Sequence, residues 1–376
     1  MNITYVANVR MPTENAHGVQ IAKTCEAFAR AGETVTLIVP KRRNSLTGSP
    51  FSYYGIKENF TVVYVPVLDT ALWGKLGFLL ETLSFAHAAL SRIWKGELLY
   101  GRDEIVLAFF ILCGAQNVVW ESHTGAWNIA ARYVARRGQA IVVISEGLRK
   151  FYLARGVAER KLVVARDGVS LADFENPEPK ETSRRRLGLP LDKKIVLYVG
   201  GLGGRKGIDT LCKAAALLPH DCNVALIGGI PQEIERFKKN YPRVIFLGRR
   251  DYKELPRNQS AADVLVLPNT AENIVSSQFT SPLKLFTYMA ARIPIVASDL
   301  PSIREVLDDT SAYLVAPDDA EALARGIATA LSDESAARAK AEAAYVKVSE
   351  FDWQKRAEKI LAFVRERLFV SVRENG

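Results

Sequence analysis

The sequence has 376 residues, of which 48% are hydrophobic and 24% are charged, as in soluble globular proteins large enough for two domains. The formal net charge of +9 favours an anionic partner, such as a nucleotide, an acidic lipid surface or a nucleic acid. The four cysteines lie far apart, which argues against a metal cluster or a disulfide framework and suits a reduced cytoplasmic interior. No apolar run reaches about 18 residues, so a membrane-spanning helix is excluded.

Short apolar runs alternate with helical patterns through the first half of the chain. We expect strands at residues 2–8, 34–39, 60–67, 98–100, 118–123 and 141–145. We expect helices at 19–31 and 75–93, and a third that ends near Cys113. This alternation predicts a parallel sheet covered by helices on both faces, and therefore an α/β domain over residues 1–175.

A segment rich in proline and charge follows, and the sequence predicts a linker over residues 176–192. The strand–helix pattern then restarts and predicts a second α/β domain over 193–350. Its strands are expected at 194–199, 224–227, 244–247, 263–268, 293–298 and 313–315. The tail, 351–376, has apolar residues at helical spacing and predicts a helix that packs back towards the first domain.

The clearest candidate site lies after the strand at 263–268. Ser281 is suited to be the N-cap of the next helix, and Pro282 to be its first residue. A helix start offers unpaired amide groups at the positive end of the helix dipole, where phosphates bind. Lys284, in the first turn, is unfavourable for the helix alone but favourable beside a bound anion. The pattern predicts a diphosphate site.

A second phosphate-binding candidate is the glycine-rich turn at residues 200–207, which contains Arg205 and Lys206. Glycines let the backbone approach a phosphate closely. By itself the signal is weak, because the turn matches neither the P-loop nor the dinucleotide fingerprint. The alternative is a turn with two solvated cations. The helix start in the same domain favours the phosphate interpretation.

These segments resemble the family-four retaining glycosyltransferases, which have the GT-B architecture of two Rossmann-like, doubly wound domains that face each other across a cleft. The resemblance covers nearly the whole chain. The segments that carry it in the second domain are 198–207, 227–229, 246–248, 262–264, 280–290 and 294–299. In the first domain they are 143–148 and 167–169.

The resemblance implies roles for residues of the second domain. Lys206 matches the family's diphosphate lysine, and Arg205 stands in for an arginine whose place is taken by Gly201. At the helix start, the diphosphate would be bound by Ser281, Leu283 and Lys284. At the nucleotide base, the implied residues are Gly248, Arg249 and Arg250.

In the first domain, the resemblance implies that Gly18 lets the backbone approach the sugar phosphate. It also implies that His123, at a strand end, faces the donor sugar. A lone histidine is more often structural, but its position at the end of a strand favours the functional role.

Two positions depart from the family pattern. The family carries two glutamates eight residues apart, and here Phe279 and Thr287 occupy those positions. The second glutamate accepts hydrogen bonds from the ribose, whereas Thr287 could form one neutral bond at most. Weaker donor binding, an unusual donor or loss of activity would follow.

The implied activity is that of a hexosyltransferase: transfer of a sugar from a nucleoside diphosphate, with a UDP-sugar favoured, to an acceptor hydroxyl with retention at the anomeric carbon. Lys206, Arg205 and the helix start would stabilise the leaving diphosphate, so we expect neither a metal nor a cofactor. With Phe279 in place of a carboxylate, a front-face route suits the sequence better than double displacement.

The segment Leu72–Leu80, followed by Arg92, Trp94 and Lys95, combines aromatics, leucines and cations. It suits either a membrane interface or a core helix with its loop. We expect a cytoplasmic enzyme, peripheral on the inner face of the membrane, that acts on a lipid-linked or envelope glycan such as a polysaccharide or lipopolysaccharide.

Three other functions stay open. The first is a nucleotide-sugar epimerase, and the second is a catalytically weakened sugar-nucleotide-binding protein. A nucleic-acid-binding protein ranks last, because no basic stripe interleaved with aromatics is present.

Overall fold

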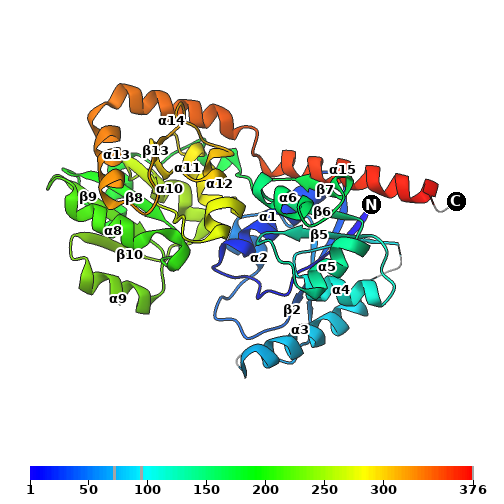
Figure 1. Cartoon of the computed structure of the whole chain (residues 1–376). Helices are drawn as coiled ribbons and strands as arrows, with labels where there is room; N and C mark the ends of the chain where they lie inside the picture. Colours follow the sequence, from blue (N-terminus) through cyan, green and yellow to red (C-terminus); the bar gives the residue numbers. More distant parts are fainter. Residues whose placement is uncertain (71–72, 94–95, 375–376) are drawn as a thin grey trace. The chain divides into compact units, whose positions relative to one another are not determined.

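The structure is a computed structural model that describes residues 1–70, 73–93 and 96–374 (Figure 1). The chain divides into two compact units. The first unit contains Met1–Arg166 and Trp353–Gly376, and the second contains Asp167–Asp352. The parts of the membrane prediction that fall on Leu72, Trp94 and Lys95 lie outside the described residues.

The first unit is built on a sheet in which the described strands follow the order β3-β2-β1-β4-β5-β6-β7. All of their pairings are parallel. The strands are β1 (Asn2–Val6), β2 (Thr34–Pro40), β3 (Thr61–Val65), β4 (Leu98–Gly101), β5 (Val118–Ser122), β6 (Ala140–Val143) and β7 (Leu162–Val164). The direction of strand order reverses between β1 and β4, and ligands of doubly wound proteins bind at the carboxyl edge beside such a reversal.

Helices connect these strands. They are α1 (Ala16–Arg30), α2 (Pro50–Tyr54), α3 (Gly74–Leu90), α4 (Glu104–Leu112), α5 (Ile129–Arg137), α6 (Glu146–Leu153) and the terminal α15 (Trp353–Glu374). Helix α15 packs against α1, and it buries Ile360, Leu361 and Val364. The end of the chain is therefore part of the first unit.

The second unit has a sheet whose described strands follow the order β10-β9-β8-β11-β12-β13, again all parallel. The strands are β8 (Lys194–Val199), β9 (Cys222–Ile227), β10 (Val244–Gly248), β11 (Val264–Leu267), β12 (Ile295–Ser298) and β13 (Tyr313–Val315). The order reverses between β8 and β11, as in a Rossmann fold. The prediction of two doubly wound α/β units is confirmed.

Apolar side chains fill both faces of the second sheet. Phe286 and Met289, from α11 (Leu283–Ala290), belong to the cluster on one face. Leu211, from α8 (Ile208–Leu217), and Ile327, from α13 (Ala320–Ser332), belong to the cluster on the other. The remaining helices are α7 (Lys180–Leu187), α9 (Pro231–Asn240), α10 (Leu255–Gln259), α12 (Pro301–Arg304) and α14 (Glu334–Val348).

The segment 176–192 differs from the predicted linker, because it contains helix α7 and belongs to the second unit. Arg184 anchors this helix: its guanidinium donates to the carbonyl oxygens of Ala261 at 2.9 Å and Lys193 at 3.1 Å. It also pairs with Asp263 at 2.5 Å. Arg184 and Asp263 are only 7% and 13% exposed, so α7 is held by a largely desolvated ion pair.

This arrangement predicts that Arg184→Met lowers the free energy of unfolding by about 2 kcal/mol. Two carbonyls lose their donor, and Asp263 loses one charged partner while it keeps Lys180 and the amide of Ile195. Arg185→Met is the matched control, because Arg185 lies on the same helix and pairs with Glu181 in solvent. Its effect should stay below about 0.5 kcal/mol. Chemical denaturation measures both values, and equal losses would show that α7 is not anchored by this pair.

Candidate functional site

The loops that leave the carboxyl ends of β8, β9, β10 and β11 pack closely at the reversal of the second sheet. The amide of Gly228 donates to the carbonyl oxygen of Gly248 at 2.8 Å. A Cβ added at Gly228 would lie 2.0 Å from the carbonyl oxygen of Gly200, and one added at Gly207 would lie 1.6 Å from that of Pro268. Glycine is therefore required here for close approach between loops, and the backbone of the glycine-rich turn lies at the sheet edge.

Lys284 extends from the first turn of α11 towards the glycine-rich turn. Its Nζ donates to the hydroxyl of Tyr198 at 2.6 Å and lies 3.9 Å from the centre of the tyrosine ring. The Tyr198 hydroxyl in turn donates to the carbonyl oxygen of Gly201 at 2.8 Å. Tyr198, which the sequence prediction did not include, thus joins the end of β8, the glycine-rich turn and the lysine.

The ammonium group of Lys284 is held in an unfavourable environment. Burial, and then the positive charge of Lys206, hold the pKa of Lys284 well below its usual value. The charges of Lys206 and Lys284 therefore act on each other, and a bound anion would stabilise both. That these two lysines bind a diphosphate stays a prediction.

Helix α11 starts one residue later than expected. Leu283 is its first residue, and Pro282 is an N-cap without a side-chain hydrogen bond. The Ser281 hydroxyl cannot cap the helix, because it accepts the amide of Asp167 at 3.1 Å and is buried. The backbone of Leu283 and Lys284 forms the uncapped first turn. Anion binding there stays a prediction, while the role of Ser281 as N-cap is wrong.

Other predicted donor residues lie along the neighbouring loops. Gly248 ends β10, and the Arg249 Nε donates to the carbonyl oxygen of Gly229 at 3.1 Å, which ties the loops after β9 and β10 together. Arg250 is exposed. Arg205 belongs to a short 3₁₀ turn, Gly204–Lys206, and its side chain lies outside the described part of the structure.

The two positions of the family glutamates are buried. Phe279 is 4% exposed and Thr287 is 1% exposed. The Thr287 hydroxyl donates to the carbonyl oxygen of Lys284 and accepts from Gln259, both at 3.0 Å. The one hydrogen of the Thr287 hydroxyl is therefore already donated within the second unit. The contact between Thr287 and the donor stays a prediction.

In the first unit, His123 directly follows β5, and its side chain is 15% exposed. Its Nε2 lies 2.6 Å from a carboxylate oxygen of Glu121, which is completely buried. Burial, and then the nearby Arg102 guanidinium, lower the pKa of His123 to about 4. The imidazole is consequently neutral at physiological pH.

Gly18 lies inside α1 rather than in the preceding loop, which corrects its predicted position. A Cβ there would lie 2.2 Å from the Tyr54 hydroxyl. Two residues later, Gln20 donates to Glu121, the same carboxylate that contacts His123. Gly18 and His123 therefore belong to one edge of the first sheet.

Sequence reasoning missed Glu121, although its position was informative. It is the one ionisable residue of the strand Val118–Ser122, whose five residues are all buried. A charge in such a strand must find partners, because an unpaired buried carboxylate is strongly disfavoured.

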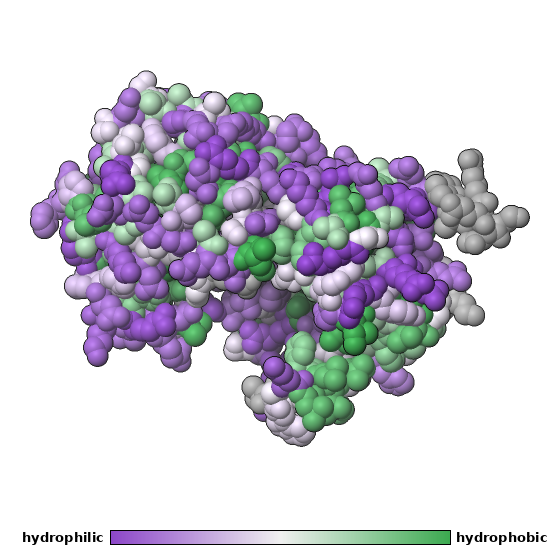
Figure 2. Space-filling model, in the orientation of Figure 1, coloured by the Kyte–Doolittle hydropathy of each residue, from purple (hydrophilic) through white to green (hydrophobic). Residues whose placement is uncertain are grey.

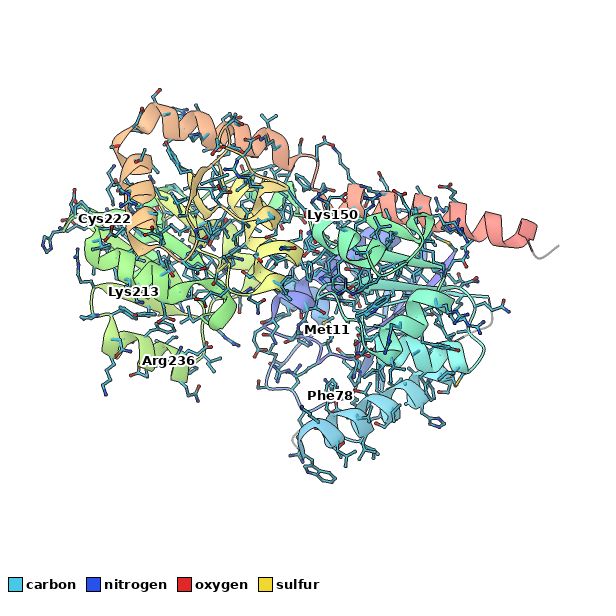
Figure 3. All side chains as sticks on the ribbon, viewed as in Figure 1. Met11, Phe78, Lys150, Lys213, Cys222 and Arg236 are labelled. Atoms are coloured by element: carbon cyan, nitrogen blue, oxygen red, sulfur yellow. The ribbon has the colours of Figure 1, made fainter. Side chains whose placement is uncertain are left out.

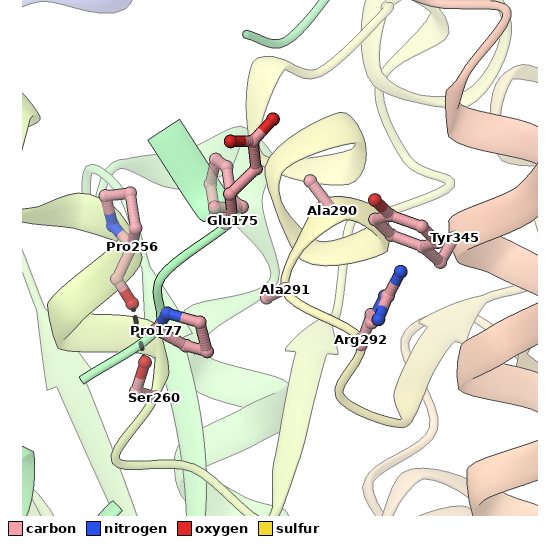
Figure 4. A pocket seen from close by; sticks show the side chains of 9 residues that line it. Glu175, Pro177, Pro256, Ser260, Ala290, Ala291, Arg292 and Tyr345 are labelled. Carbon is pink, nitrogen blue, oxygen red and sulfur yellow. Dashed lines mark hydrogen bonds between the residues drawn. The ribbon is translucent and has the colours of Figure 1, made fainter. Parts of the chain in front are cut away.

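A cavity of about 250 Å³ lies at the other end of α11 (Figure 4). Its lining includes Glu175, Ala290, Arg292 and Tyr345, and it contains none of the predicted donor residues. The Arg292 guanidinium stacks 3.6 Å from the centre of the Tyr345 ring. Among the described residues, no group of three or more histidine, cysteine, aspartate or glutamate side chains could hold a metal ion.

Residues 193–333 match the family described as glycosyl transferases group 1. The second unit therefore resembles the group 1 glycosyltransferases. This match covers β8 to α13, which includes the glycine-rich turn and Lys284. TuaC of Bacillus subtilis, which is named for teichuronic acid biosynthesis, is 29% identical over 56% of this chain and 51% of TuaC. The chain thus spans about half the length of the first curated relatives that it matches.

Solved glycosyltransferase structures share the fold along nearly the entire chain. Sucrose-phosphate synthase from Thermosynechococcus elongatus has a TM-score of 0.79 at 22% identity, covering 98% of this chain and 99% of that one. Anabaena HepE, in complex with UDP and glucose, has a TM-score of 0.76 at 17% identity, covering 96% and 99%. These similarities confirm the predicted GT-B fold class.

The lysine pair predicts pH-dependent binding of inorganic pyrophosphate. Because the pKa of Lys284 is lowered, the free protein loses this charge as pH rises, and binding must then restore the proton. Affinity should therefore fall as pH rises through the lowered pKa of Lys284, and comparison with a variant that lacks this lysine separates the effect from the titration of pyrophosphate itself. Lys284→Met should weaken binding about tenfold or more and remove the lysine's contribution to this pH dependence.

Lys213→Met is the control for that measurement, because Lys213 is exposed on α8 (Figure 3). Isothermal titration calorimetry should give the wild-type profile for this variant. A wild-type pH profile in Lys284→Met would show that the lysine does not bind the anion.

Proposed function

We propose that the chain transfers a sugar from a UDP-sugar to an acceptor hydroxyl with retention of anomeric configuration. The observation that supports this most is the meeting of Lys206 and Lys284 at the reversal of the second sheet, beside the uncapped first turn of α11. Such a site suits a diphosphate leaving group. The group 1 family and the complex of Anabaena HepE with UDP and glucose support the choice of donor.

In the proposed reaction, the bond between the anomeric carbon and the diphosphate oxygen breaks. A bond from the anomeric carbon to the acceptor oxygen forms on the same face, and the acceptor proton moves to the departing phosphate oxygen. The lysines stabilise the negative charge that builds on the diphosphate, without a metal. Phe279 is buried and apolar, so it supplies no carboxylate nucleophile, which favours this front-face route over double displacement.

His123 would act on the sugar rather than on the phosphate. As a neutral imidazole bonded through Nε2 to Glu121, it presents Nδ1 as an acceptor for a sugar hydroxyl. Thr287, whose hydroxyl is used internally, favours a second candidate function: a sugar-nucleotide-binding protein with weakened activity. A nucleotide-sugar epimerase is the third candidate, and it would alter the sugar without needing an acceptor.

The proposed acceptor is a lipid-linked or envelope glycan, in keeping with the name of TuaC. Support comes from α3, whose outward side chains form a cluster of exposed apolar residues. This α3 patch consists of Trp73, Leu76, Phe78, Leu79, Leu80 and Leu83, each between 39% and 74% exposed. Figure 2 shows these apolar side chains gathered at the lower edge of the view, and Phe78 is labelled in Figure 3.

Exposed apolar patches of this kind mark interaction surfaces, and basic residues accompany this one. Arg42 pairs with the buried Glu81 of α3, and its neighbours Lys41 and Arg43 are exposed, as is Lys75 on α3 itself. Apolar and basic side chains together suit an anionic lipid surface. No described helix has the length and apolar character to cross a bilayer, so the proposed association is peripheral.

The first test is incubation of the purified protein with UDP-, GDP-, ADP- and dTDP-sugars, followed by measurement of released nucleotide and of the recovered sugar. We expect slow release of UDP from a UDP-sugar, and about a hundredfold loss in Lys206→Met because an electrostatic stabiliser of the leaving group is removed. Recovery of an altered sugar would indicate an epimerase. Binding without any release, with or without glycan extracts, would indicate a weakened binder.

The second test is sedimentation with vesicles that contain phosphatidylglycerol. We expect binding at low salt that weakens at high salt. Leu76→Glu combined with Leu80→Glu should reduce binding about tenfold or more, because two apolar side chains leave the interface and two like charges enter it.

Leu112→Glu combined with Leu217→Glu is the control for the vesicle test. These leucines are 71% and 56% exposed on other helices, so the same change should leave vesicle binding intact. Absence of wild-type binding at low salt, or equal loss in both double variants, would contradict the membrane assignment.

A further inference from the structure

Glu121 is the centre of a buried hydrogen-bond network that reaches the end of the chain. One carboxylate oxygen accepts from His123 Nε2 at 2.6 Å, from the Arg356 guanidinium at 2.8 Å and from the Gln20 amide. The other accepts from the Tyr100 hydroxyl. Glu121 is completely buried, and the Arg356 side chain is 3% exposed. Arg356 lies in α15, 235 positions from Glu121.

The neighbours of this network fix its orientation. Arg102 donates to the Gln20 side-chain oxygen at 3.0 Å, so the amide nitrogen of Gln20 must be the atom that points to Glu121. Arg356 also donates to the Thr24 hydroxyl at 3.2 Å. With Arg356, Gln20 and Tyr100 all acting as donors, Glu121 remains an ionised acceptor, and the proton between Glu121 and His123 belongs on His123 Nε2.

We propose that Glu121 and Arg356 are positioning residues for His123, and that α15 thereby sets the tautomer and charge of the imidazole. Glu121 selects the Nε2–H tautomer and leaves Nδ1 as the acceptor, because the hydrogen bond made by one ring nitrogen fixes the state of the other. Arg356 compensates the charge of Glu121, so that the carboxylate does not draw a second proton onto the ring. The assignment of Nδ1 to a sugar hydroxyl rests on the proposed function. The effect of Glu121 and Arg356 on the tautomer and charge of His123, which we call the coupling, does not.

Three charged groups surround His123, and each belongs to a different segment: Glu121 of β5, Arg102 after β4 and Arg356 of α15. Burial alone would raise the pKa of Glu121, but Arg356 and the bond from His123 outweigh it and hold that pKa well below its usual range. Arg356 and Arg102 both lower the pKa of His123. Loss of Arg356 should therefore raise the pKa of His123, since Glu121 would then act on the ring without compensation.

The test is nitrogen-15 NMR of the full-length protein with labelled histidine, in which the ring shifts report tautomer and charge. The chain has four histidines, and His123→Gln identifies the relevant signal. In the wild type we expect a neutral Nε2–H ring between about pH 5.5 and 8. In Arg356→Met the His123 signal should titrate at a higher pH than in the wild type, and Arg356→Lys should restore the wild-type behaviour in large part.

Arg365→Met is the matched control, because Arg365 also lies in α15 and pairs with a buried glutamate of the first unit, Glu33. It should loosen the helix without changing the His123 signal. An unchanged signal in Arg356→Met, or the same shift in Arg365→Met, would overturn the proposal. Glu121→Gln is the complementary variant and should remove the tautomer preference.

Activity provides a separate comparison. If the protein releases UDP, Arg356→Met should lower the rate most at acidic pH, where its His123 becomes protonated, and the rate should recover as pH rises. A variant that is slow at every pH to the same degree would indicate a structural defect and contradict positioning. Should the NMR shift occur without any UDP release, the coupling stands and the proposed function fails.

Discussion

The all-parallel pairing of both sheets is the constraint on which the rest of the structure depends. Apolar side chains must cover both faces of such a sheet, which leaves the carboxyl edge as the place where polar groups can gather. In the second unit, the loops after β8 and β11 leave this edge on opposite sides of the strand-order reversal. Gly200 and Lys284 come close together there because Gly200 has no side chain that would contact the lysine.

Both candidate sites contain a charge held in a poorly solvated place, but the partners differ. Lys284 has a neutral phenol, Tyr198, as its hydrogen-bond acceptor and another lysine nearby. Its charge is therefore under-compensated, and an incoming anion would gain from it. Glu121 is instead compensated by Arg356. The site of Lys284 would therefore be stabilised by an added anion. Glu121 already has a compensating charge, and it contacts a neutral imidazole.

The local patterns that the sequence shows were sufficient for most of the strands and for the glycine-rich turn after β8. Apolar runs predicted most of the described strands, and glycine spacing located the turn at residues 200–207. The errors arose where a distant residue decides the outcome. Helix α7 was taken for a linker because its anchor, Asp263, lies 79 positions from Arg184. Ser281 matched an N-cap by pattern, yet its hydroxyl is used by Asp167, 114 positions away.

The same limit explains why His123 could be predicted while its supporting residues could not. A polar residue at a strand end is visible in a local window, whereas Gln20 and Arg356 lie 101 and 235 positions from Glu121. A charged residue inside a buried strand indicates that it has partners, but it does not show which residues they are. Only the packing of α1 and α15 does so.

The buried Glu121–Arg356 pair has a physical cost, since desolvation of two charges often exceeds their attraction. Its retention is understandable if a neutral imidazole is needed. In the proposed sugar transfer, positive charge would build on the sugar ring, and an imidazolium about 4 Å away would oppose it by about 4 kcal/mol at an effective dielectric constant near 20. Glu121 alone would fix the tautomer but would attract that unwanted proton. With Arg356 beside it, the Glu121 carboxylate can orient the imidazole while the imidazole stays uncharged. A single buried carboxylate could orient the ring but could not also keep it neutral.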